Sequence, residues 1–251
     1  MSNIMIDQRF RGPPNSGNGG YVCGLLGQQL GPCAEVTLHK PIPLDIPMAV
    51  RPGADDGIEL CDGDVLLATA RLSDLMLDAL PRVSFAEASA ASRATPFDEN
   101  NHDVPGCFVC GPGRAEGDGM RILAGPLKMP DAANPVPFAS HWLPDDNLAA
   151  ADGFVAEEFI WACLDCPTGH AVLGGNFDEG DSDESVLLGR MAARIMDRPR
   201  PGEACVITAR QGARSGRKLL ADSALYGAAG NLLAFARATW ITVPRQMVVA
   251  Q

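Results

Sequence analysis

The stretch Leu66-Leu-Ala-Thr-Ala-Arg71 returns late in the chain as Leu232-Leu-Ala-Phe-Ala-Arg237, with five of the six residues identical. Each copy directly follows a turn that contains glycine, Gly63 in the first case and Gly230 in the second. A segment that recurs in the same local context indicates an internal duplication. The residues before the two copies extend the similarity.

The same order of elements precedes both copies. Gly20-Tyr-Val22 and Gly153-Phe-Val155 open the two best helical segments, residues 20–30 and 154–166. Strand-like runs bounded by turn residues follow each helix. They cover 34–39, 46–50, 57–61 and 65–72 in the first half, and 186–196, 203–210, 218–226 and 231–241 in the second. The sequence thus predicts one helix followed by four strands, twice.

A duplicated unit of this kind needs a way to cover its helix. A curved antiparallel sheet can wrap the helix, and two such sheets can join edge to edge so that the joined edges are not left open. The predicted fold class is α+β, with two tandem units that each hold a central helix in a curved antiparallel sheet. We expect an N-terminal unit at 1–81, an Ala/Ser-rich linker at 82–105 and a C-terminal unit at 106–251. The alternative is an unrelated α+β pair whose matching residues arose by chance.

Composition narrows the choice of partners. The chain has 251 residues, of which 46% are hydrophobic, and a formal net charge of −11. Such an acidic chain, without a cluster of Lys or Arg, repels phosphate backbones, which argues against nucleic acid. The N-terminus is too polar for a signal peptide, and no apolar run is long enough for a membrane span. We expect a cytoplasmic protein whose eight cysteines are free thiols.

Three short motifs carry a resemblance to a known family. Asn18-Gly-Gly20 stands at a helix start, Leu164-Asp165 lies within the second helical segment, and Cys107-Phe-Val-Cys110-Gly precedes the strands of the second half. With these motifs the sequence resembles the hotdog-fold acyl-CoA thioesterases, and more loosely their tandem, double-hotdog type. The resemblance implies a double hotdog that cleaves an acyl-CoA thioester to free acid and CoA. It also implies no cofactor and further pairing of chains into a homo-oligomer.

The residues at these motifs suit thioester chemistry. Backbone N–H groups at a helix start can hold the thioester carbonyl, so Asn18, Gly19 and Gly20 are the expected substrate-binding residues. A carboxylate must activate water or attack directly, and Asp165 is the first candidate for the catalytic residue. The alternative catalytic carboxylates, nearer the start of the same helix, are Glu157 and Glu158.

The resemblance also implies how the two halves share a site. In paired hotdog units the helix start of one unit faces the carboxylate of the other, so the glycines of the first half would work with Asp165 of the second. The corresponding position in the first half falls near Gly27 or Gln28, and neither is a base. We therefore expect one competent site per chain.

Other functions remain open at this point. A non-catalytic acyl-CoA or acyl-chain binding protein of the same fold would keep the cavity and lack the base. A hydratase or dehydratase of that fold typically pairs Asp with His, and no histidine stands at either predicted helix start.

Cysteines and basic residues raise two further questions. The pairs Cys107/Cys110 and Cys163/Cys166 could supply four thiolates to zinc, but the second pair lies within an apolar helix, where thiols more often face the core. We therefore expect no metal site. Contacts to CoA would come from basic residues near the cleft, and the candidates are Arg114, Arg190, Arg214 and Lys218.

Overall fold

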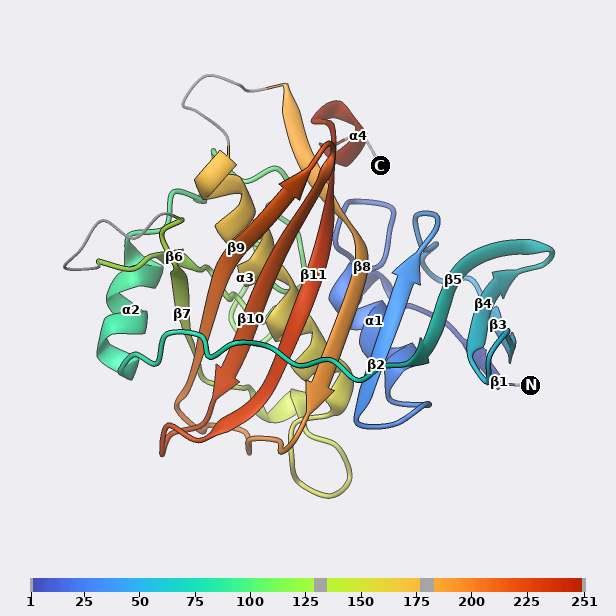
Figure 1. Cartoon of the computed structure of the whole chain (residues 1–251), viewed down its shortest axis with the longest axis horizontal. Coiled ribbons are helices and arrows are strands. Elements are labelled where there is room, and N and C mark those ends of the chain that lie inside the picture. Colours follow the sequence, from blue (N-terminus) through green and yellow to red (C-terminus); the bar gives the residue numbers. More distant parts are fainter. Residues whose placement is uncertain (1, 129–134, 177–182, 250–251) are drawn as a thin grey trace.

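The computed structural model describes residues 2–128, 135–176 and 183–249. Within these residues eleven strands form one antiparallel sheet, in the order β1-β3-β4-β5-β2-β8-β11-β10-β9-β7-β6 (Figure 1). The strands are β1 (Ser2–Ile4), β2 (Cys33–Leu38), β3 (Met48–Pro52), β4 (Ile58–Asp62), β5 (Val65–Leu72), β6 (Gly125–Pro126), β7 (Phe138–Trp142), β8 (Glu184–Ile195), β9 (Cys205–Ser215), β10 (Lys218–Tyr226) and β11 (Leu232–Pro244). The helices are α1 (Gly19–Gly27), α2 (Phe85–Arg93), α3 (Glu157–Asn176) and α4 (Gln246–Val249), with short 3-10 turns at Gln8–Phe10 and Asp146–Leu148.

The centre of the sheet is the pairing of β2 with β8, where Val36 lies opposite Met191. Outward from this junction the order is β2, β5, β4, β3 on one side and β8, β11, β10, β9 on the other. Each of the eight strands expected from the sequence is present and overlaps its expected range, and β5 and β10 have the expected bounds. Strands β1, β6 and β7, which extend the two outer edges, were not expected.

Helices α1 and α3 lie side by side on one face of the sheet (Figure 1). A stripe of glycines on α1 lets them approach closely, because a Cβ at Gly20, Gly24 or Gly27 would overlap Asp165, Glu158 or Trp161 respectively. Residues spaced by four and three positions share one face of a helix. From Gly20 to Gly24 the contact on α3 moves back from Asp165 to Glu158, as expected for antiparallel helices.

Helix α3 differs from its expected range at both ends. Gly153 has φ of +81° and lies in a turn before α3, which begins at Glu157. Gly20, by contrast, lies within α1. At the other end, the helix continues through Pro167, although proline removes a helical N–H donor. Side chains bond to carbonyls near this point: Ser223 Oγ donates to Leu164 O at 2.7 Å, and Thr168 Oγ1 donates to Asp165 O at 2.6 Å. Tertiary packing thus extends the helix past a residue that usually ends one.

The segment expected as a linker contains helix α2. The helix begins with a capping box in which Ser84 accepts from Glu87 N–H and the Glu87 side chain accepts from Ser84 N–H. Its buried face, Ala88 and Ala91, packs in one cluster with Ala139 of β7. The chain between β5 and α2 crosses the sheet on the face opposite α1 and α3 (Figure 1). Residues 82–105 are therefore an ordered, packed connection.

Candidate active site

A cavity of about 630 Å³ lies beside the start of α1. Its walls come from the residues before and at the start of α1, the middle of α3, strands β8 and β11, and the loop that carries Cys107 and Cys110. Asn18, Gly19 and Asp165 all line it. The cavity is therefore where the motifs singled out in the sequence meet.

The start of α1 carries both used and unused amide groups. Asn18 is the N-cap, and its Oδ1 accepts from Tyr21 N–H at 2.9 Å. Gly20 N–H donates to Asp165 Oδ2, also at 2.9 Å. Gly19, at the first helical position, has no intrahelical partner for its N–H, and the described part of the chain shows no other acceptor for it. The Gly19 amide is thus the group at this helix start that a ligand in the cavity can reach.

Asp165 is a buried carboxylate, with 1% of its surface exposed. Its Oδ1 atom has no hydrogen-bond partner among the described residues, while Oδ2 is held by Gly20. Burial raises the pKa of Asp165 to about 7, and the hydrogen bond from Gly20 opposes that shift. A carboxyl group with a pKa close to neutral can both take and return a proton.

Glu157 and Glu158 lie elsewhere. They occupy the first turn of α3, are partly exposed and do not line the cavity. The main chain of Glu158 packs against Gly24, and the Trp161 ring one turn later packs against Gly27. Of the three carboxylates selected from the sequence, the structure brings Asp165 alone to the glycines of α1.

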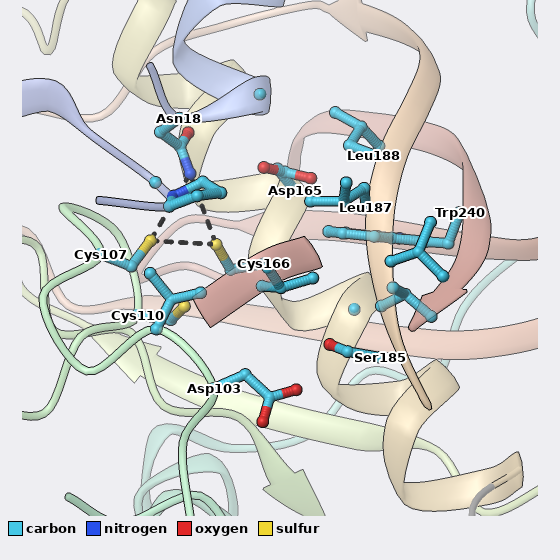
Figure 2. A pocket seen from close by; sticks show the side chains of 18 of the residues that line it. Asn18, Asp103, Cys107, Cys110, Asp165, Cys166, Ser185, Leu187, Leu188 and Trp240 are labelled. Atoms are coloured by element: carbon cyan, nitrogen blue, oxygen red, sulfur yellow. Dashed lines mark hydrogen bonds between the residues drawn. The ribbon is translucent and has the colours of Figure 1, made fainter. Parts of the chain in front are cut away.

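The cysteines are grouped differently from the sequence expectation. Cys107, Cys110 and Cys166 line the cavity, and Asn18 Nδ2 donates to Cys107 Sγ and Cys166 Sγ (Figure 2). Hydrogen bonds from Cys110 and Cys166 lower the pKa of Cys107. Cys163 is not part of this group, because its Sγ donates to Ile160 O within α3. The spacing of the two Cys-x-x-Cys pairs did not show that Cys166 joins Cys107 and Cys110 while Cys163 does not. That grouping depends on which side of α3 faces the cavity.

The cavity also has apolar walls and charged groups. Leu173 of α3 and Trp240 and Val243 of β11 line it, and Trp240 Nε1 donates to Thr168 Oγ1 at 2.8 Å. Two cationic side chains, Lys40 and Arg245, also line it.

Arg245 forms an ion pair with Asp103 at 2.6 Å. The basic residues proposed from the sequence, Arg114, Arg190, Arg214 and Lys218, do not line the cavity. Lys40 and Arg245 lie just after the ends of β2 and β11, with no sequence motif around them. Their place in the cavity wall could therefore be seen only in the folded structure.

Two solved structures match nearly the whole chain. A TesB protein of Mycobacterium avium subsp. paratuberculosis aligns over 92% of this chain and 89% of its own, with a TM-score of 0.59 and 10% sequence identity. A Novosphingobium aromaticivorans protein named as a thioesterase aligns over 95% and 94%, with a TM-score of 0.58 and 13% identity. The chain has the hotdog fold of these proteins. The hotdog fold implied by the sequence motifs is thereby confirmed.

Sequence comparison adds nothing to this fold assignment. No family model and no curated protein matches this sequence. Among the described residues, no helix is both long and apolar enough to cross a membrane.

Proposed function

We propose that the protein hydrolyses an acyl-CoA thioester, with Asp165 as the catalytic carboxylate and the start of α1 as the carbonyl-binding group. The observation that carries this proposal is the 2.9 Å hydrogen bond from Gly20 N–H to Asp165 Oδ2 in the cavity wall. It joins residues 145 positions apart and sets a buried carboxylate beside a helix start with an unpaired amide. That combination serves the attack of water on an activated carbonyl.

In the proposed reaction the thioester oxygen accepts a hydrogen bond from Gly19 N–H, assisted by the positive end of the α1 dipole. Asp165 Oδ1 takes a proton from a water molecule while the water oxygen bonds to the carbonyl carbon. The tetrahedral intermediate then collapses with cleavage of the C–S bond. The sulfur leaves with the proton that Asp165 returns, and the new acid is released. Gly20 N–H holds Oδ2 in place throughout.

The lining of the cavity supports an acyl-CoA rather than a small polar ester. The apolar side chains of Leu173, Trp240 and Val243 suit an acyl chain. Lys40 and Arg245 suit the phosphates of CoA, since phosphate groups favour Lys and Arg partners.

The sheet order supports a second part of the proposal, that the chain consists of two tandem hotdog units. Helix α1 with β2–β5 would form the first unit, and α3 with β8–β11 the second. In each, the strand after the helix lies at the central junction and the last strand lies next to it. This proposed division keeps the boundaries expected from the sequence, with a connection at 82–105. The proposed site then lies between the units, because Gly20 and Asp165 come from different helices.

The test is release of free CoA by the full chain from acyl-CoAs of graded chain length. We expect the substitution Asp165→Asn to lower kcat by about 10²- to 10⁴-fold, the range that general acid–base catalysis contributes. The matched control is Glu158→Gln, which makes the same chemical change on the same helix outside the cavity and should leave kcat within about twofold. Circular dichroism confirms that both variants fold.

Two results would contradict the proposal. Turnover that survives in Asp165→Asn but falls in Glu158→Gln would move the catalytic role to the first turn of α3. Saturable acyl-CoA binding by the wild type without any CoA release would identify a non-catalytic binding protein, the alternative that the sequence left open.

A further inference from the structure

Three cysteine thiols form a cluster in the cavity wall that the proposed hydrolysis does not use (Figure 2). The Sγ atoms of Cys107, Cys110 and Cys166 lie within 4.8 Å of one another, and each residue is at most 6% exposed. We propose that these three cysteines bind one zinc ion as thiolates. This proposal does not depend on the thioester hydrolysis proposed above.

The separations of the sulfur atoms fit a tetrahedral ion. With Zn–S bonds of about 2.3 Å, two sulfur ligands of one zinc ion lie about 3.8 Å apart. Cys107 Sγ and Cys166 Sγ are 3.9 Å apart, although they belong to a loop and to helix α3. Cys110 completes a triangle around the position that the ion would take.

The loop with Cys107 and Cys110 is shaped to present both thiols to one point. Gly111 N–H donates to Cys107 O at 2.9 Å and closes the turn. A Cβ at Gly111 would overlap the main chain of Pro105 and Cys107, so this close turn requires glycine. A tight Cys-x-x-Cys turn is a common half of a zinc site, and helix α3 supplies Cys166 as the third ligand.

Donor groups surround the sulfur atoms as they do in metal–thiolate centres. Asn18 Nδ2 donates to Cys107 Sγ at 3.6 Å and to Cys166 Sγ at 3.7 Å (Figure 2). A ring nitrogen of His102 and one of His170 each lie within 4.8 Å of Cys110 Sγ. Partners of this kind around the metal ligands orient them and tune the site.

The two histidines are not ligands in this arrangement. The main-chain N–H of Val104 donates to His102 Nδ1 at 3.0 Å, and that of Ala124 donates to His170 Nδ1 at 3.1 Å. A neutral imidazole that accepts at Nδ1 carries its proton on Nε2, which therefore cannot bind a cation. Both Nε2 atoms are buried and lack a partner among the described residues.

The ligand set is therefore three thiolates. A tetrahedral zinc ion has a fourth position, and since all three cysteines line the cavity, water or a bound molecule can fill it from that side. Three protein ligands with an open fourth position make the ion accessible to chelators. We expect zinc to be removable and to return on titration.

The experiment measures zinc in the untagged, reduced full chain, by elemental analysis after purification and by zinc titration of the chelator-treated protein against a chromophoric chelator. We expect about one zinc ion per chain. The single substitutions Cys107→Ser, Cys110→Ser and Cys166→Ser should each weaken zinc binding by more than the 10- to 100-fold that loss of an outer partner costs. Cobalt substituted for zinc should show thiolate-to-metal charge-transfer absorption.

The matched control is Cys163→Ser, which removes a buried thiol one turn earlier on α3 and should leave zinc binding unchanged. Equal loss of zinc in Cys163→Ser and Cys166→Ser would overturn the proposal, because the loss would then reflect damage to the helix. So would wild-type protein that remains folded and reduced but takes up no zinc on titration. Loss of zinc in His170→Gln as complete as in Cys110→Ser would overturn the three-thiolate ligand set.

Discussion

The starts of helices α1 and α3 each contact the other helix, but their surroundings differ. At the start of α1, Gly19 and Gly20 meet Asp165 and a cavity. At the start of α3, Glu158 packs its main chain on Gly24, and the fully buried Trp161 ring fills the space against Gly27. The start of α1 is therefore open to the cavity and contacts a carboxylate, whereas the start of α3 is closed by packed side chains and contacts glycines.

The difference shows what turns a helix start into a site. Both starts carry the positive end of a helix dipole and amides that have no acceptor within the helix. Only the first combines small residues, which leave room for a substrate, with an acid supplied by the neighbouring helix. One competent site per chain, with Gly27 or Gln28 in place of the second acid, stays a prediction from the sequence that activity measurements test.

The largest expected effect is at the closed start. Replacing Trp161 by Ala empties the space against Gly27 and should lower the free energy of unfolding by about 3–5 kcal/mol. Denaturant unfolding followed by circular dichroism measures it. A loss below about 1 kcal/mol would show that the ring does not fill this space, and the contrast between the two starts would be wrong.

Matched glycine substitutions on α1 sharpen the comparison. Gly20→Ala and Gly27→Ala both force a methyl group into a close contact and should each cost about 1–3 kcal/mol of stability. Gly20→Ala also displaces Asp165, so its turnover should fall on the order of 100-fold, whereas Gly27→Ala should leave the turnover of folded protein nearly unchanged. Unfolding curves and CoA release, measured on the same samples, separate the two effects. Equal turnover in the two variants would refute a special role for the α1 start.

The N-cap of α1 gives a smaller effect. Asn18→Ala removes the acceptor for Tyr21 N–H and should cost about 1 kcal/mol, while Asn18→Ser keeps an acceptor and should recover most of that loss. Thermal unfolding of the two variants is the measurement. If both variants lost the same stability, the contribution of Asn18 would come from its sulfur contacts rather than from the cap.

The smallest effect is expected from the acids of the α3 start. Glu157→Gln removes a negative charge from the first turn and should cost about 0.3–1 kcal/mol at low salt, less at high salt, because the charge favours the helix dipole. Unfolding at two salt concentrations tests this, and turnover should not change. A large drop in turnover with unchanged stability would make Glu157 part of the site.

Local patterns predicted much of the fold. Alternating apolar runs bounded by turn residues identified the strands from β2 to β5 and from β8 to β11, because both signals are local. The same reasoning placed the end of α3 before Pro167, where Ser223 and Thr168 bond to nearby carbonyls and the helix continues. It also took residues 82–105 for a linker, since the buried face of α2 consists of alanines with little apolar signal.

The order of the strands along the chain, the helix start at Asn18-Gly-Gly20 and the candidate acids Asp165, Glu157 and Glu158 could all be predicted from the sequence, because they depend on local patterns. Which of those acids lies at the start of α1 depends on how the two helices pack. Gly20 allows close contact with the turn of α3 that carries Asp165, whereas Gly24 contacts the main chain of Glu158. The packing of α3 also separates Cys166, which lines the cavity, from Cys163, whose thiol donates to Ile160 O. Side chains three residues apart on a helix differ in direction by a fraction of a turn, and the sequence spacing does not show which direction faces the core and which faces the cavity.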